Sequence, residues 1–102
     1  MIFVFEVHVH PGRTAEAYAE AWVRASEIIQ KAPGARGTRL HRKIGDDRTL
    51  LAMASWDSKA QRDAMEANPA AEVQRIIAEQ AEFVDVRVIG EFEDPDWVVN
   101  PG

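Results

Sequence analysis

Two histidines on the first predicted strand are the residues whose types and spacing point most directly to chemistry. His8 and His10 stand two residues apart in segment 2–10, which is rich in β-branched and aromatic residues and therefore predicts a strand. Alternate residues of a strand share one face about 6.5–7 Å apart, so both imidazoles and Glu6 point the same way. Two imidazoles so placed can bind a metal, with His41 as the available third ligand, although this motif alone is weak. The alternative is that His10 is exposed at the strand end and His8 lines a barrel.

His8 is also the candidate general base. An imidazole with an ordinary pKa of about 6.5 can abstract a proton near neutral pH. The alternation of the strand puts His8 on the face opposite Phe5 and Val7. A pocket on the Phe5 side of the sheet would therefore leave His8 outside it.

Five further residues are candidates for substrate binding. They are aromatic or, in the case of methionine, flexible and apolar, and they could line a cleft for a flat ligand: Phe5, Tyr18, Trp22, Trp56 and Met65. Aromatic residues at helical and strand spacing are most often core residues, so core packing is the alternative for the whole set. Both roles can hold for Trp56, because it stands at a strand end.

The composition disfavours several functional classes. A net charge of −5 over 102 residues disfavours binding to the anionic nucleic-acid backbone. The basic group on the second predicted strand is too small to outweigh that charge: Arg36, Arg39, Arg42 and Lys43. The absence of cysteine excludes disulfides and thiolate chemistry and is consistent with a cytoplasmic protein. We expect neither a signal peptide nor a membrane span, since the first residues lack a basic region and no apolar run approaches ~20 residues.

Turn formers and hydrophobic periodicity put these candidates on a β-α-β-β-α-β series of elements. Thr14 is the predicted N-cap of the first helix, and Ser58 with Gln61 forms a capping-box pattern at the second. Asn68-Pro69 is predicted to end the second helix, and the same pair suits the start of a third helical segment, with Asn68 as N-cap and Pro69 as its first residue. The predicted segments are a strand at 2–10, a helix at 14–31, strands at 36–44 and 49–56, a helix from 58 that is broken at Pro69, and a strand at 83–92.

This series predicts an α+β, ferredoxin-like domain over residues 1–92, with a four-stranded antiparallel sheet and helices on one face. The other face carries apolar side chains that favour burial, namely Ile2, Val4, Leu40, Ile44 and Ile89. We therefore expect a homodimer in which two sheets pair into a dimeric α+β barrel. Residues 93–102 form a tail containing Trp97, for which we expect either docking on the partner subunit or a frayed end.

The ordered set of motifs resembles the antibiotic biosynthesis monooxygenase family. The resemblance is carried by Phe5 to Gly12 with its Pro-Gly turn, Ala32 to Ala35, Leu50 to Ser58 with Trp56, and Val84 to Phe92. It implies a homodimer with a small pocket between the sheet and the helices of each subunit. It also implies oxidation of electron-rich aromatics, such as anthrones and quinols, without a metal or flavin cofactor. In that chemistry the protein deprotonates the substrate, and the resulting carbanion reduces oxygen.

Two departures from the family pattern keep other functions open. Relatives often carry a histidine close to the proline of the third helix, whereas this chain has Asn68-Pro69-Ala70-Ala71 and no histidine within 58–82. Haem-degrading relatives use an asparagine on the first strand, where this chain has Phe5, so haem degradation is not expected. The leading interpretation is a cofactor-independent monooxygenase acting on a small aromatic. The alternatives are a non-catalytic small-molecule-binding dimer, a lyase or isomerase on the same barrel, and the metal-binding variant.

Overall fold

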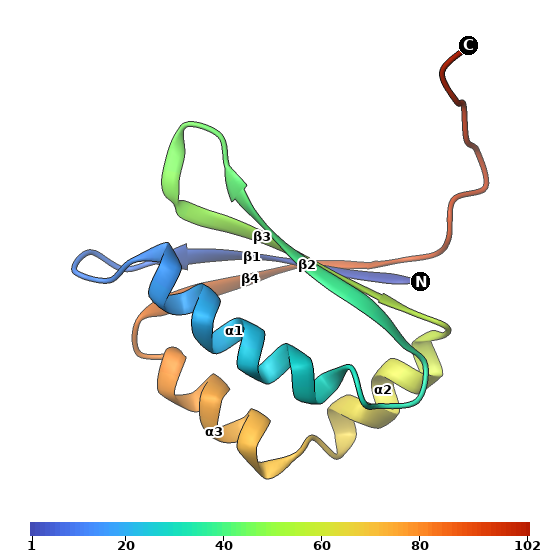
Figure 1. Cartoon of the computed structure of the whole chain (residues 1–102). Helices are drawn as coiled ribbons and strands as arrows, with labels where there is room; N and C mark the ends of the chain where they lie inside the picture. Colours follow the sequence, from blue (N-terminus) through green and yellow to red (C-terminus); the bar gives the residue numbers. More distant parts are fainter.

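Four antiparallel strands form one twisted sheet, and three helices lie against one of its faces (Figure 1). The computed structural model describes residues 1–102. In chain order the elements are β1 (Ile2–Val9), α1 (Ala15–Ile29), β2 (Ala35–Lys43), β3 (Asp46–Trp56), α2 (Lys59–Ala67), α3 (Ala71–Gln80) and β4 (Val84–Phe92). The strand order is β2-β3-β1-β4, and each neighbouring pair is antiparallel. The predicted α+β, ferredoxin-like fold is therefore confirmed.

The first two helices begin at the predicted caps. The Thr14 hydroxyl accepts a hydrogen bond from the Ala17 N–H at 3.1 Å, and Ser58 Oγ accepts one from the Gln61 N–H at 3.2 Å. Gly34, in the turn before β2, has a positive φ of 87°, and a Cβ there would come within 2.5 Å of the Gln61 side chain. The start of α2 is thus fixed both by its own cap and by close packing against this turn.

The break between α2 and α3 differs from the prediction. Asn68 is the C-cap of α2, since its N–H donates to the Met65 carbonyl at 3.2 Å. The residue before α3 is Ala70, which has an extended backbone and makes no side-chain capping bond. The predicted N-cap role of Asn68 is therefore wrong, because its backbone belongs to the end of the preceding helix.

The hydrophobic core lies between the sheet and the helices, in two clusters. One joins the middle of the sheet to the start of α1 and contains Val7, Val9, Ala15, Tyr18, Leu50 and Val84. The other joins α1 to α3 and contains Ala21, Ala25, Val73 and Ile76. Val7 has no exposed surface, and burying a side chain of this kind contributes about 1.5–3 kcal/mol. It marks the centre of the sheet face that the helices cover.

The opposite face of the sheet carries no helix (Figure 1). The pairing of β1 with β3 sets Val4 beside Met53 and His8 beside Thr49 on this face. Its centre is therefore apolar, while its far end, toward the β2–β3 hairpin, is polar.

Two residues predicted for this uncovered face lie elsewhere. Leu40 pairs with Ala52 and packs on the core beneath the helices, because the alternation of β2 puts it on the covered side. Ile44 stands at the tip of the β2–β3 hairpin, beside Gly45, and is 99% exposed. Neither residue contributes to the face that was expected to pair with a second sheet.

Met1 and the end of β4 lie at the same end of the sheet. Met1 and Trp56 exchange backbone hydrogen bonds of 2.9 and 3.1 Å, and the Met1 ammonium pairs with Asp94 at 2.7 Å. Beyond Asp94 the chain leaves the domain as an extended tail (Figure 1). Trp97, in this tail, is 89% exposed. None of the helices combines the length and the hydrophobicity that crossing a bilayer requires.

Candidate functional site

A cavity of about 370 Å³ lies between the covered face of the sheet and the helices. Of its 23 lining residues 16 are hydrophobic, so a ligand that fills it must be largely apolar. The five residues predicted for substrate binding all line it: Phe5, Tyr18, Trp22, Trp56 and Met65. The fold therefore brings these residues together around one cavity, while their role in binding a substrate stays a prediction.

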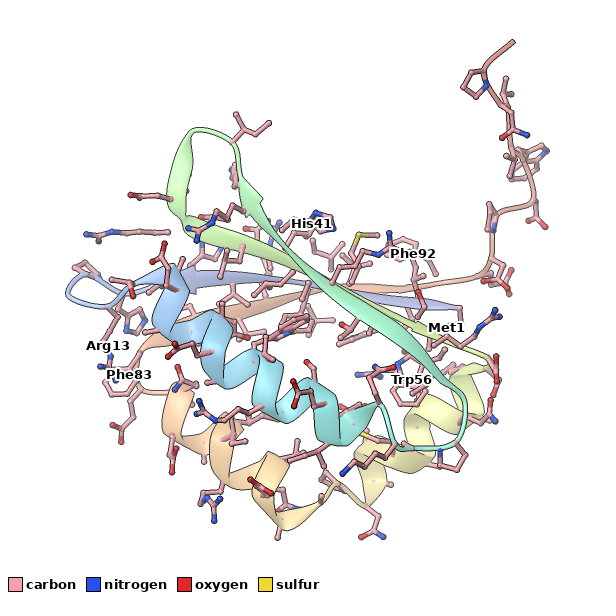
Figure 2. The ribbon with its side chains drawn as sticks, viewed as in Figure 1. Met1, Arg13, His41, Trp56, Phe83 and Phe92 are labelled. Atoms are coloured by element: carbon pink, nitrogen blue, oxygen red, sulfur yellow. The ribbon has the colours of Figure 1, made fainter.

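The sheet supplies one wall of the cavity. Phe5 lies on β1 opposite Ala52, on the side that faces the helices. Trp56 ends β3 beside Met1 (Figure 2), and the two residues are joined by backbone hydrogen bonds in both directions. Only 3% of Trp56 is exposed. Trp56 therefore has little freedom to move away from the cavity.

Helix α1 supplies the facing wall. Tyr18 and Trp22 are four residues apart, so their side chains project from the same side of the helix. Ala25 follows one turn later on that side and also lines the cavity. Its small side chain leaves space that a larger residue would fill.

Three hydrogen-bond donors on these aromatic side chains have no partner within the chain. The Tyr18 hydroxyl and the indole N–H groups of Trp22 and Trp56 make no hydrogen bond with another group of the protein. Burial raises the pKa of Tyr18 to about 12, so its hydroxyl stays protonated and able to donate at neutral pH. Solvent reaches these donors, since no buried side-chain nitrogen or oxygen lacks a partner, and an oxygen atom of a ligand would take the place of that water.

Arg62 is the one cationic residue that lines the cavity, and the sequence analysis did not single it out. It lies on α2, is only 8% exposed, and its guanidinium lies 3.6 Å from the centre of the Phe3 ring. Its Nη1 pairs with Glu66 at 3.0 Å and with Glu91 at 3.7 Å. An arginine four residues before a glutamate is typical of an exposed helix face, so the sequence pattern concealed its burial.

His8 lies on the uncovered face and does not line the cavity. Its Nε2 is 2.5 Å from Glu6, which also pairs with Arg87 at 3.7 Å. Its Nδ1 is 3.2 Å from the Thr49 hydroxyl, and this hydroxyl donates to Asp46 at 2.6 Å. Both ring nitrogens therefore already have partners within the chain. The role of His8 as a base stays a prediction, and it requires a ligand on this face.

The three histidines considered as metal ligands do not converge on one site. His10 pairs with Asp85 at 3.1 Å, and His41 lies on β2, which β3 separates from β1 (Figure 2). No group of three or more histidine, aspartate or glutamate side chains has an arrangement that could hold a metal ion. The third ligand that His8 and His10 would need is not in place within one chain.

Comparisons with known proteins agree with this geometry. The model of the antibiotic biosynthesis monooxygenase family matches residues 1–74. SnoaB, a cofactor-independent oxygenase from Streptomyces nogalater, shares the fold with a TM-score of 0.73 and 14% identity, over 94% of this chain and 96% of its own. A candidate antibiotic biosynthesis monooxygenase from Deinococcus radiodurans matches over the full length of both chains, with a TM-score of 0.73 and 12% identity. Likeness at these identities shows the fold alone. No curated protein matches the sequence.

Proposed function

The chain belongs to the antibiotic biosynthesis monooxygenase family, and from this premise we propose that it is a cofactor-independent monooxygenase of a small, electron-rich aromatic. The observation that carries the proposal is the cavity of about 370 Å³ beneath the helices, with its aromatic walls and unpaired donors. Small-molecule sites span about 300–1,000 Å³, so this cavity favours a compact ligand. SnoaB, which shares the fold, is by its description an oxygenase of this cofactor-independent kind.

In the proposed reaction the substrate supplies all the electrons. An anthrone-type CH₂ group loses a proton to give a carbanion conjugated with the ring oxygen, and this carbanion reduces and then binds O₂. The CH₂ group becomes a carbonyl: one atom of O₂ stays on carbon, and the other leaves with both hydrogens as water. This oxidation transfers four electrons from carbon to O₂, so the reaction needs no external reductant.

The protein's proposed contribution is to bind the substrate, exclude water and stabilise the anion. Tyr18, Trp22 and Trp56 are assigned as donors to the substrate's oxygen atoms, because fixed donors in a dry site act more strongly on developing charge than water does. No imidazole lines the cavity, and its single carboxylate, Glu66, is 62% exposed. The proposed acceptor of the substrate proton is therefore water at the mouth beside Glu66. His8 would serve as the base only for a ligand on the other face.

A non-catalytic small-molecule-binding protein is the second candidate function. The observation that favours it is the lack of an unpaired titratable base in the cavity, since Glu66 is engaged by Arg62 at 3.0 Å. Such a protein would retain the ligand unchanged in air. A lyase or isomerase would convert the ligand without consuming oxygen.

We also propose that two subunits pair through their uncovered sheet faces. The support is the apolar centre of that face, where Met53 is half-buried and Phe92 is 47% exposed, whereas Val4 between them is already buried within one chain. Pairing would bury this surface, and a small domain gains most from such burial. The tail of residues 93–102 would then lie over the partner, which supplies contacts that Trp97 lacks in its own subunit.

Oxygen uptake tests the proposed function. Metal-depleted protein is incubated with a panel of anthrones, quinols and catechols in an oxygen electrode, and the same panel without protein supplies the background rate. We expect protein-dependent uptake with at least one of these compounds, and its loss in the Ala25→Leu variant, whose three added carbons narrow the cavity. Uptake that Ala25→Leu leaves intact would mean that the chemistry takes place elsewhere.

A further inference from the structure

Arg62 brings a positive charge into a largely apolar cavity, and the proposed reaction does not use this charge. Only 10% of its side chain is exposed, and the Phe3 ring covers one side of the guanidinium at 3.6 Å. Removing a cation from water is costly unless nearby anions compensate for the lost hydration. How far the neighbouring carboxylates neutralise Arg62 therefore indicates whether it can also bind an anionic ligand.

Neighbouring carboxylates neutralise Arg62 only in part. A β-bulge in β4 shifts the alternation of that strand, so that Glu91 pairs with Phe3 and faces α2. Glu91 is nevertheless held mainly by Lys59, whose Nζ lies 3.1 and 3.3 Å from its two oxygens, against 3.7 Å for Arg62. Glu66 is thus the only close counter-ion of Arg62, and it is largely exposed.

The guanidinium of Arg62 also has N–H donors that its ion pairs do not use. Both of its ion pairs run through Nη1, whereas an arginine has five N–H donors in a planar fork. This fork suits an oxyanion better than a neutral oxygen, because charge-assisted hydrogen bonds are roughly twice as strong as neutral ones. A ligand oxyanion could use the free donors or displace the solvent-facing Glu66 carboxylate.

We propose that Arg62 holds an anionic oxygen of the ligand, so that the cavity takes aromatic phenols and enols as their oxyanions. The inference rests on the proposed function in one respect, since it assigns the ligand to the same cavity. It adds the chemical class of the ligand and the end of the cavity at which the charge lies, next to Phe3 and α2. Stabilising the oxyanion there would also favour the carbanion with which it is conjugated.

Tyr18 marks the other end of the cavity. Tyr18 packs in the same core cluster as Val7. Val7 lies four residues after Phe3 on β1, and at ~3.3 Å per residue this separates Val7 from Phe3 by about 13 Å along the strand. Its hydroxyl stays protonated, so it suits a neutral acceptor such as a carbonyl oxygen. The favoured ligand is therefore an elongated polycycle with an acidic hydroxyl at one end and a carbonyl at the other.

The test uses 4-nitro-1-naphthol, an electron-poor probe whose phenol and phenolate forms absorb at different wavelengths. Titration of the bound probe in the intact protein gives its pKa in the cavity. In wild-type protein we expect the phenolate to bind about tenfold more tightly than the phenol, so that the pKa of the probe falls on binding. Arg62→Met removes this preference, whereas Arg62→Lys retains most of it. Arg75→Met, a change of an exposed arginine on α3 outside the cavity, leaves it unchanged.

The Glu66→Gln variant is the control for misfolding as a cause of lost phenolate binding in Arg62→Met. This change removes the competing carboxylate, so the phenolate should bind more tightly than in wild-type protein, a gain that misfolding cannot produce. An unchanged or raised pKa of the probe in wild-type protein, or an Arg62→Met variant that behaves as wild type, overturns the inference. The probe is not oxidised, so the outcome is independent of turnover. A lowered probe pKa without oxygen uptake from the substrate panel would keep the anion site and reject the oxygenase.

Discussion

A larger side chain at Ala25 of α1, beside the cavity, should not destabilise the protein. The same enlargement at Ala21, one turn earlier in the packed core, should destabilise it. Ala25 and Ala21 both face α3 in the same cluster, but only Ala25 lines the cavity, and Ala21 is 1% exposed. Replacing each in turn with leucine adds the same three carbons to the same helix. The two variants therefore differ only in whether the surrounding structure has room for the new side chain.

The expected magnitudes follow from burial and packing. Each buried CH₂ contributes about 0.8 kcal/mol, so Ala25→Leu gains up to about 2 kcal/mol, less about 0.5–1 kcal/mol of side-chain entropy. Ala21→Leu meets Val73 and Ile76, and overpacking of this kind costs about 1–3 kcal/mol. We therefore expect the free energies of unfolding of the two variants to differ by about 3 kcal/mol.

Thermal and urea unfolding measure this difference. For a domain of this size about 1 kcal/mol moves Tm by roughly 4–8 °C, so the two variants should melt more than about 10 °C apart. Ala25→Leu should also fail to bind 4-nitro-1-naphthol, although it is folded. Equal destabilisation of both variants would mean that no open space lies beside Ala25, contrary to this prediction.

Three further predictions concern the uncovered face of the sheet. Hydrogen bonds from the Thr49 hydroxyl and a backbone N–H hold the pKa of Asp46 below its ordinary value. The stability that this carboxylate contributes is present above about pH 4 and is lost as the pH falls through the lowered pKa, so Thr49→Val should lose less Tm than wild type between pH 5 and pH 3. Met53→Asp should halve the mass measured by sedimentation, whereas Val23→Asp on the outer side of α1 should not. His8→Ala should leave oxygen uptake unchanged, and a loss of uptake would move the chemistry to this face.

Local chemistry made most of the fold predictable. The caps at Thr14 and Ser58 and the strict alternation of β1 are properties of a few neighbouring residues, and the structure reproduces them. The face of Leu40 was misassigned, because β2 is mostly polar and offers no apolar pattern that fixes its alternation. The end of α2 at Asn68 was predicted correctly, but the N-cap of α3 was misplaced there, because the same residue type suits both the end of one helix and the start of the next.

The aromatic residues that line the cavity were predictable from the sequence, but the charged residue Arg62 in its wall was not. Aromatic residues at strand and helix spacing indicate a common interior, which is how Trp22 and Trp56 were selected. Arg62 escaped notice because its pairing with Glu66 has the spacing of a surface ion pair. The approach of Glu91 depends on a bulge in β4, and a one-residue shift of that kind has no reliable signal in the sequence.

The central claim is that this chain inserts one atom of O₂ into an aromatic bound in the cavity. The most direct test is product analysis by mass spectrometry after reaction of metal-depleted protein with an anthrone under ¹⁸O₂. We expect one labelled oxygen in the product, in a protein-dependent reaction that Ala25→Leu abolishes. Product that takes its oxygen from water, or conversion that proceeds equally well without O₂, would contradict it.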